Sequence, residues 1–168
     1  MKLLPFSLTS FFLGLVALSL GQSLVAQSPS VIYFEELTER IEVESDTLYV
    51  VNFWATWCRP CVAELPYFDA AQAAYADRKV KVLLVSLDFK EDLDTKVVPF
   101  LKRRPAQSEV LLLDEPKYHT WMDKVADEWT GAIPATVFVK KSADIRVFHE
   151  GDFTQEALFE EIESLINE

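Results

Sequence analysis

Two cysteines separated by two residues are the side chains of this sequence best suited to chemistry. Cys58 and Cys61 are the only cysteines in the 168-residue chain. The apolar run 48–54 that precedes them is typical of a buried strand, and the apolar residues that follow them have roughly helical spacing. The sequence therefore predicts that the pair lies where a strand passes into a helix, with Cys58 at the helix start and Cys61 one turn further on.

That position favours thiol chemistry. Unpaired N–H groups and partial positive charge at a helix start stabilise a thiolate, which is the attacking form of cysteine. Pro60 suits the first turn because its missing N–H would have no partner there. The second thiol of such a pair can expel a partner bound to the first. Thiol–disulfide exchange is therefore the favoured prediction, and a static disulfide is the simplest alternative.

A zinc site is the other alternative for the cysteine pair. A structural zinc ion normally has four ligands. His119 and His149 are the only histidines, and neither lies at ligand spacing from the cysteines. We therefore expect no metal and no cofactor.

The run 52–61, Asn-Phe-Trp-Ala-Thr-Trp-Cys-Arg-Pro-Cys, resembles the active site of the thioredoxin superfamily. It is most similar to the exported TlpA/ResA-type thiol:disulfide oxidoreductases, and the likeness extends over about residues 31–168. The resemblance implies that Cys58 is the exposed nucleophile and Cys61 the buried resolving thiol. It also implies that Pro134 forms a cis peptide bond beside the disulfide, as a catalytic-site residue.

The same resemblance implies a role for Glu64. Thioredoxin itself has a buried aspartate six residues before the first cysteine, where this chain has Asn52. TlpA/ResA-type proteins often have asparagine there and place a glutamate three residues after the second cysteine, which is the position of Glu64. Glu64 is then expected to take the proton of Cys61 as the mixed disulfide resolves. The alternative is a solvated glutamate on a helix surface.

Four further residues are expected to contact the substrate: Trp57, Arg59, Pro60 and Ile133. Trp57 is predicted at the rim of the site. Arg59 would favour the thiolate of Cys58, although a solvated arginine with little effect is an alternative. A cis Pro134 would leave the backbone of Ile133 exposed beside the sulfurs, where a substrate strand could pair with it.

The pattern of residues at the N-terminus is typical of a targeting segment. Lys2 is followed by the apolar run 11–20 and by small residues around Ala26, which predicts a signal peptide over residues 1–26. Residues 27–168 would then form one thioredoxin-like domain in the periplasm or another extracytoplasmic, membrane-associated location. The alternative is an uncleaved N-terminal membrane anchor.

The charge of the chain bears on its partners. The net charge is -11, and removal of Lys2 would make it about -12 by formal count. Such acidity argues against nucleic acid and against anionic membrane surfaces. The expected partners are protein disulfide substrates and a membrane or periplasmic electron donor, and the protein is expected to be a monomer.

The pattern of elements predicts an α/β protein built as a three-layer α/β/α sandwich with a central mixed sheet. The resemblance implies that this is a thioredoxin fold with an inserted helical segment. The expected strands are 48–54, 80–88, 110–113, 135–139 and 145–149, the last two joined as a hairpin. Besides the helix after Cys58, helices are expected at 30–41, 94–103, 118–125 and 154–167. Ser30 and Asp94 are the candidate caps of the first two, and the last is expected to bury Leu158, Ile162 and Leu165.

These observations predict an exported thiol:disulfide oxidoreductase that reduces disulfides of extracytoplasmic proteins. The apolar surroundings of the cysteines and the nearby Glu64 favour the reducing direction. The resemblance implies the same direction, since proline at the second spacer position, here Pro60, goes with reductants in the superfamily. A disulfide-forming oxidase is the alternative within the enzyme class. A copper-handling or redox-inert binding module on the same fold is the alternative outside it.

Overall fold

A six-stranded mixed sheet forms the centre of the protein. The computed structural model describes residues 28–168, so the predicted signal segment 1–26 lies outside the described residues. The strand order is β1-β4-β3-β2-β5-β6. The first four are mutually parallel, whereas β5 runs antiparallel to β2 and β6 antiparallel to β5. The strands are β1 (Ser30–Ile32), β2 (Leu48–Trp54), β3 (Val80–Ser86), β4 (Glu109–Leu113), β5 (Ala135–Lys140) and β6 (Ile145–Glu150).

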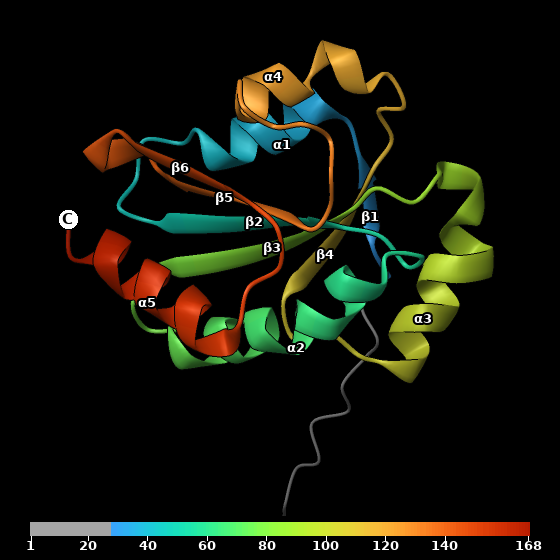
Figure 1. Cartoon of the computed structure of the whole chain (residues 1–168), viewed down its shortest axis with the longest axis horizontal. Coiled ribbons are helices and arrows are strands. Elements are labelled where there is room, and N and C mark those ends of the chain that lie inside the picture. The colour runs from blue at the N-terminus through green and yellow to red at the C-terminus, as the bar shows by residue number, and fades with distance from the viewer. Residues whose placement is uncertain (1–27) are drawn as a thin grey trace, which may run out of the picture.

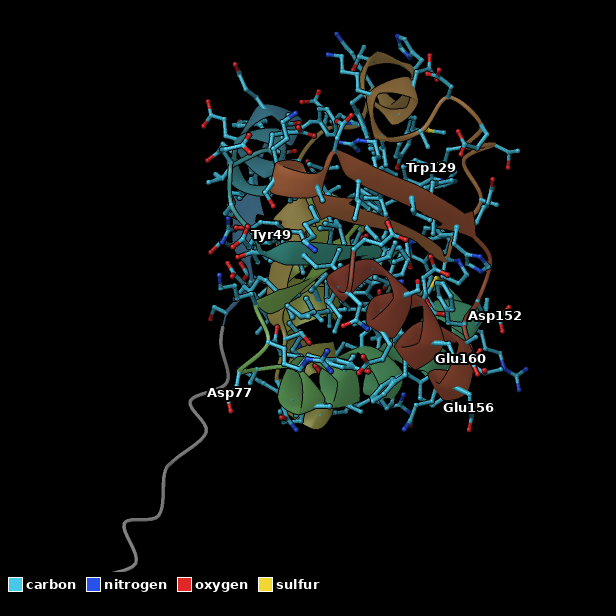
Figure 2. All side chains as sticks on the ribbon, turned by 90° about the vertical axis from the view of Figure 1, so that its left-hand side faces the viewer. Tyr49, Asp77, Trp129, Asp152, Glu156 and Glu160 are labelled. Atoms are coloured by element: carbon cyan, nitrogen blue, oxygen red, sulfur yellow. A yellow bond between two sulfur atoms is a disulfide. The ribbon has the colours of Figure 1, made fainter. Side chains whose placement is uncertain are left out.

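Helices cover both faces of this sheet. As Figure 1 shows, α1 and α4 lie on one face, and α2 and α5 on the other with α3 beside them. Figure 2 shows Glu156 and Glu160 on the outer side of α5, away from the sheet. The predicted three-layer α/β/α sandwich is therefore confirmed. The helices are α1 (Phe34–Ile41), α2 (Arg59–Ala74), α3 (Val98–Arg103), α4 (Met122–Val125) and α5 (Gln155–Ile166).

The apolar character of β2 follows from its place inside the sheet. Val50 and Trp54 belong to the hydrophobic cluster shared with α2 and α5, whereas Val51 and Phe53 belong to the cluster shared with α1 and α4. Successive side chains of a strand point to opposite faces, and here both faces are covered. This explains why the strand before the cysteines reads as a continuous apolar run.

The predicted helix 30–41 is wrong in its first part. Residues 30–32 form the edge strand β1, which pairs with β4 over residues 111–113. The helix begins at Phe34, so Ser30 is not its cap; instead the backbone N–H of Tyr33 donates to the Glu36 carboxylate at 2.8 Å. Three residues are too few to signal a strand by themselves, and pairing with β4 decides their conformation.

The inserted segment between β3 and β5 is helical at both predicted places, with different detail. A tight turn at 90–92 and a wide turn at 93–97 precede α3, so Asp94 lies within the helical segment and does not cap it. The predicted helix 118–125 is split at Trp121, whose buried indole N–H donates to the Glu115 carbonyl at 2.9 Å. Within residues 28–168, no helix is long and apolar enough to cross a membrane.

Candidate active site

The two cysteines form a disulfide at the start of α2. Cys58 is the N-cap of the helix, and the backbone N–H of Cys61 points at the Cys58 sulfur at 3.3 Å. Cys58 keeps 6% of its surface accessible and Cys61 none. The resemblance implied an exposed Cys58. In this oxidised form it is only slightly accessible, but it is the more accessible of the two cysteines.

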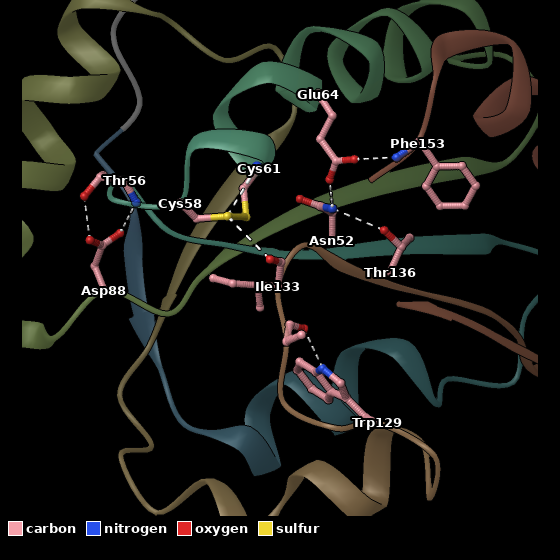
Figure 3. The surroundings of a disulfide bond; sticks show 11 residues. Asn52, Thr56, Cys58, Cys61, Glu64, Asp88, Trp129, Ile133, Thr136 and Phe153 are labelled. Carbon is pink, nitrogen blue, oxygen red and sulfur yellow. Dashed lines mark hydrogen bonds between the residues drawn. A yellow bond between two sulfur atoms is a disulfide. The ribbon is translucent and has the colours of Figure 1, made fainter. Parts of the chain in front are cut away.

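A buried carboxylate holds the loop before Cys58. Asp88, two residues after the end of β3, accepts hydrogen bonds from the Thr56 backbone N–H at 2.9 Å and from the Thr56 hydroxyl at 2.6 Å, as Figure 3 shows. It also accepts one from the Ser86 hydroxyl at 2.8 Å, and it is 2% exposed. Sequence reasoning took Asp88 only as the end of a strand. An acid at the carboxyl end of a buried parallel strand, next to the strand that leads into the cysteines, was the available signal.

The loop before β5 lies against the disulfide from the other side. The Ile133–Pro134 peptide bond is cis, which agrees with the resemblance. The Ile133 carbonyl oxygen lies 3.7 Å from the Cys58 sulfur. A disulfide sulfur carries no hydrogen, so this is a contact and not a hydrogen bond in the oxidised form. The Trp129 indole N–H anchors the loop by donating to the Ala132 carbonyl at 2.9 Å.

Glu64 is buried beneath the disulfide, so it is not the solvated glutamate that the sequence left open. It is 1% exposed and accepts hydrogen bonds from the Asn52 side-chain amide and from the Phe153 backbone N–H, both at 2.8 Å (Figure 3). Burial raises the pKa of Glu64 to about 7, against the lowering effect of these two hydrogen bonds. Because Glu64 follows Cys61 by three residues, both side chains lie on the same face of α2.

Asn52 orients that carboxyl group. Its side chain is completely buried, and its amide donates to Glu64 and, at 3.2 Å, to the Thr136 hydroxyl. When Glu64 is ionised its carboxylate only accepts, so the amide presents an N–H group to it. The amide oxygen of Asn52 is then left buried without a hydrogen-bond partner. Asn52 thus occupies the place of the thioredoxin aspartate but carries no charge of its own.

The predicted substrate-contact residues surround the disulfide at the surface. Trp57 is 65% exposed, and Arg59 and Pro60 are exposed on the first turn of α2. Ile133 is half-buried and packs against both hydrophobic clusters. In the part of the chain that the structure describes, no three His, Cys, Asp or Glu side chains are grouped to hold a metal ion.

Comparisons with known proteins agree with this geometry. The AhpC/TSA family model matches residues 37–148. The chain is 32% identical over 110 residues to the thiol-disulfide oxidoreductase ResA of Oceanobacillus iheyensis. The aligned residues cover 65% of this chain and 52% of that protein. The chain therefore spans about half the length of this relative.

Two solved structures show the same fold. The thioredoxin-related protein from Neisseria meningitidis serogroup B matches with a TM-score of 0.65 at 22% identity, over 76% of this chain and 91% of that one. A structure from Chlorobium tepidum, described as that of a thiol:disulfide interchange protein DsbE, matches with a TM-score of 0.61 at 23% identity. The match covers 77% of this chain and 84% of that one. The predicted thioredoxin fold is confirmed.

Proposed function

We propose that this chain, which belongs to the AhpC/TSA family, is a thiol:disulfide oxidoreductase that reduces disulfides of extracytoplasmic proteins. One observation carries the proposal: the Cys58–Cys61 disulfide caps α2, and the buried carboxyl of Glu64 lies one turn beyond Cys61 with a pKa of about 7. A dithiol beside a group that can accept and release a proton near neutral pH has the parts that thiol–disulfide exchange requires.

Cys58, Cys61 and Glu64 carry out successive steps of the reaction. In the reduced protein, the Cys58 thiolate attacks a substrate disulfide and releases the first substrate thiol. The Cys61 thiol then gives its proton to the Glu64 carboxylate, and the resulting thiolate attacks the Cys58 sulfur. The second substrate sulfur leaves as a thiolate and takes the proton from Glu64, and the Cys58–Cys61 disulfide forms. Two substrate thiols are produced for each dithiol oxidised.

The surroundings of Cys58 support the reducing direction. The helix start and the Cys61 N–H favour the thiolate. Three effects oppose them: the near-complete burial of Cys58, the Ile133 carbonyl oxygen 3.7 Å from its sulfur, and the negative charge of ionised Glu64. A thiol whose pKa is not strongly lowered belongs to a reducing pair, because a low nucleophile pKa stabilises the reduced form and makes the disulfide oxidising.

Equilibration with a glutathione series, with thiolate absorbance followed against pH, tests the direction. We expect a potential close to the value of about −270 mV for thioredoxin and a Cys58 pKa near or above ~7. A potential above about −180 mV together with a Cys58 pKa below ~5 would identify a disulfide-forming oxidase instead.

Trapping identifies the partners. Cys61→Ala retains the Cys58 nucleophile but cannot resolve the mixed disulfide, so it should accumulate covalent complexes with protein substrates. We propose that these are extracytoplasmic proteins, since residues 1–26 have the pattern of a signal peptide. A membrane or periplasmic donor would restore the dithiol, and neither nucleic acid nor a second subunit takes part. If every trapped partner were a cytosolic protein, the assigned compartment would be wrong.

A copper titration tests the alternative outside the enzyme class. Tight stoichiometric Cu(I) binding in competition with a chelator would favour the copper-handling alternative.

A further inference from the structure

Large apolar side chains are exposed mainly at one edge of the sheet. Within residues 28–168, the exposed large hydrophobic residues are Tyr33 (54%), Val43 (49%), Trp57 (65%), Phe89 (58%) and Tyr118 (41%). Four of these five follow the carboxyl ends of the parallel strands β1, β2, β3 and β4, in that order. Carboxyl ends of parallel strands meet at one edge of a sheet, where α/β proteins bind their ligands. We call Tyr33, Trp57, Phe89 and Tyr118 the aromatic edge.

Phe89 and Tyr118 enclose part of this edge. They line one hollow of about 170 Å³ together with the apolar side chains of Leu87, Leu113 and Pro116. An apolar cavity of about 150 Å³ is large enough to hold benzene. The hollow therefore has the size of a single apolar side chain from another molecule.

The aromatic edge is continuous with the exchange site. Trp57 directly precedes Cys58, and the loop that carries both is bound to Asp88 through Thr56. Phe89 is the next residue after Asp88. The edge runs from the disulfide over β3 and β4 towards β1, and so extends away from the Ile133 loop on the β5 side.

The charge around the hollow selects among occupants. Lys90 pairs with Asp114 at 2.6 Å, and the lining carboxylate of Asp88 is bonded to Thr56 and Ser86. The remaining carboxylates that line the hollow are those of Glu91 and Glu115. An acidic rim attracts a basic polypeptide and disfavours an anionic lipid surface.

We propose that the aromatic edge binds the polypeptide that flanks the disulfide of a protein substrate. One aliphatic or aromatic side chain of that polypeptide enters the hollow between Phe89 and Tyr118, and its basic side chains face Glu91 and Glu115. The inference rests on the proposed oxidoreductase function and deepens it, because it states which protein disulfides are preferred.

The contribution of the aromatic edge is measured by comparing the reduction of a protein disulfide with the reduction of a small-molecule disulfide. The reduced full chain is assayed with insulin and with bis(2-hydroxyethyl) disulfide, and the ratio of the two kcat/KM values is taken for each variant. Phe89→Ala and Tyr118→Ala are each expected to lower the ratio about tenfold, which corresponds to about 1.4 kcal/mol of lost transition-state binding. Val43→Ala is the control, since Val43 is also exposed but lies between α1 and β2, at the edge where the strands begin. Its ratio should equal that of the wild type.

A matched pair of disulfide-linked peptides tests the chemistry of the occupant. One peptide carries leucine and lysine beside its cysteine, and the other carries serine and glutamate at the same positions. The wild type should prefer the first about tenfold in kcat/KM, and Phe89→Ala should remove most of that preference.

Each outcome decides a separate point. If the wild type reduces neither disulfide, the proposed oxidoreductase function fails. If it reduces both, but the insulin ratio of both aromatic variants stays within twofold of wild type, the aromatic edge does not bind substrate. Equal rates with the two peptides would likewise overturn the proposal. Binding to neutral-lipid vesicles that Phe89→Ala abolishes, with the insulin ratio unchanged, would assign the edge to a membrane surface instead.

Discussion

Replacing Glu64 by glutamine is expected to change how the stability of the protein depends on pH. Glu64 is 1% exposed, and burial raises its pKa from 4.5 to about 7. Below about pH 4.5 the carboxyl is protonated in the folded and the unfolded chain. As the pH rises from 4.5 to 7, the unfolded chain loses the proton first, so the folded state binds more protons and its free energy of unfolding falls. Above pH 7 the carboxyl is ionised in both states, and the loss is complete.

The size of the effect follows from the two pKa values. Each pH unit between 4.5 and about 7 is worth 1.36 kcal/mol, so ionising Glu64 removes roughly 3 kcal/mol of stability. Glutamine does not ionise, and Glu64→Gln lacks this loss. Asn52 and Phe153 donate to different oxygens of the carboxylate, and glutamine has an NH2 group in place of one of them. One donor then loses its acceptor, which adds a pH-independent penalty of about 1–3 kcal/mol. The variant should therefore be clearly less stable than the wild type at pH 4.5 and close to it at pH 8.

Urea unfolding of the oxidised protein at intervals from pH 4 to pH 8 measures this difference. Glu160→Gln is the control, because Glu160 is an exposed carboxylate on α5 and its removal should leave the pH profile parallel to that of the wild type. A difference between wild type and Glu64→Gln that stays constant within about 0.5 kcal/mol over the whole range would refute a raised pKa at Glu64. In the exchange reaction, Glu64→Gln should slow the resolving step by up to ~10²-fold, and the rate should lose its rise near pH 7.

Three further predictions address the loop before Cys58, the core and the N-terminus. Asp88→Ala leaves the Thr56 donors without their acceptor and is expected to destabilise the protein by about 2–3 kcal/mol in urea unfolding, whereas Asp88→Asn, which can still bond Thr56, should cost less; equal losses would contradict the positioning role. Leu37→Ala removes the fully buried leucine of α1 and should cost about 2–5 kcal/mol in the same assay, so a loss below 1 kcal/mol would show that α1 packs loosely. N-terminal sequencing of the exported protein should find Gln27 first, and an intact Met1 would indicate an anchor.

Local patterns predicted much of the site. The apolar run of β2, the spacing of the cysteines and the proline between them all act within one strand-to-helix connection, so their consequences could be read from neighbouring residues. The same holds for α5, whose helical spacing predicted the buried Leu158, Ile162 and Leu165. The direction of the β5–β6 pair followed from the short connection between them.

Resemblance supplied the position of Glu64, but not its environment. Whether that carboxyl faces water or the core depends on Phe153, 89 residues further along the chain, which closes over it and donates a backbone N–H. The raised pKa exists only because of that burial.

Contacts between distant segments decided the rest. Residues 30–32 became a strand because β4 lies beside them, although their own sequence favoured a helix start. Asp88 became part of the site because β2 and β3 are parallel neighbours, which brings the loops at their carboxyl ends together. The aromatic edge has the same origin, since its four residues lie far apart in sequence and share only the edge of the sheet. The sequence by itself determined which side chains could exchange a disulfide, whereas the tertiary structure decided which carboxylates and aromatic rings surround it, because burial and cross-strand proximity are properties of the packed chain.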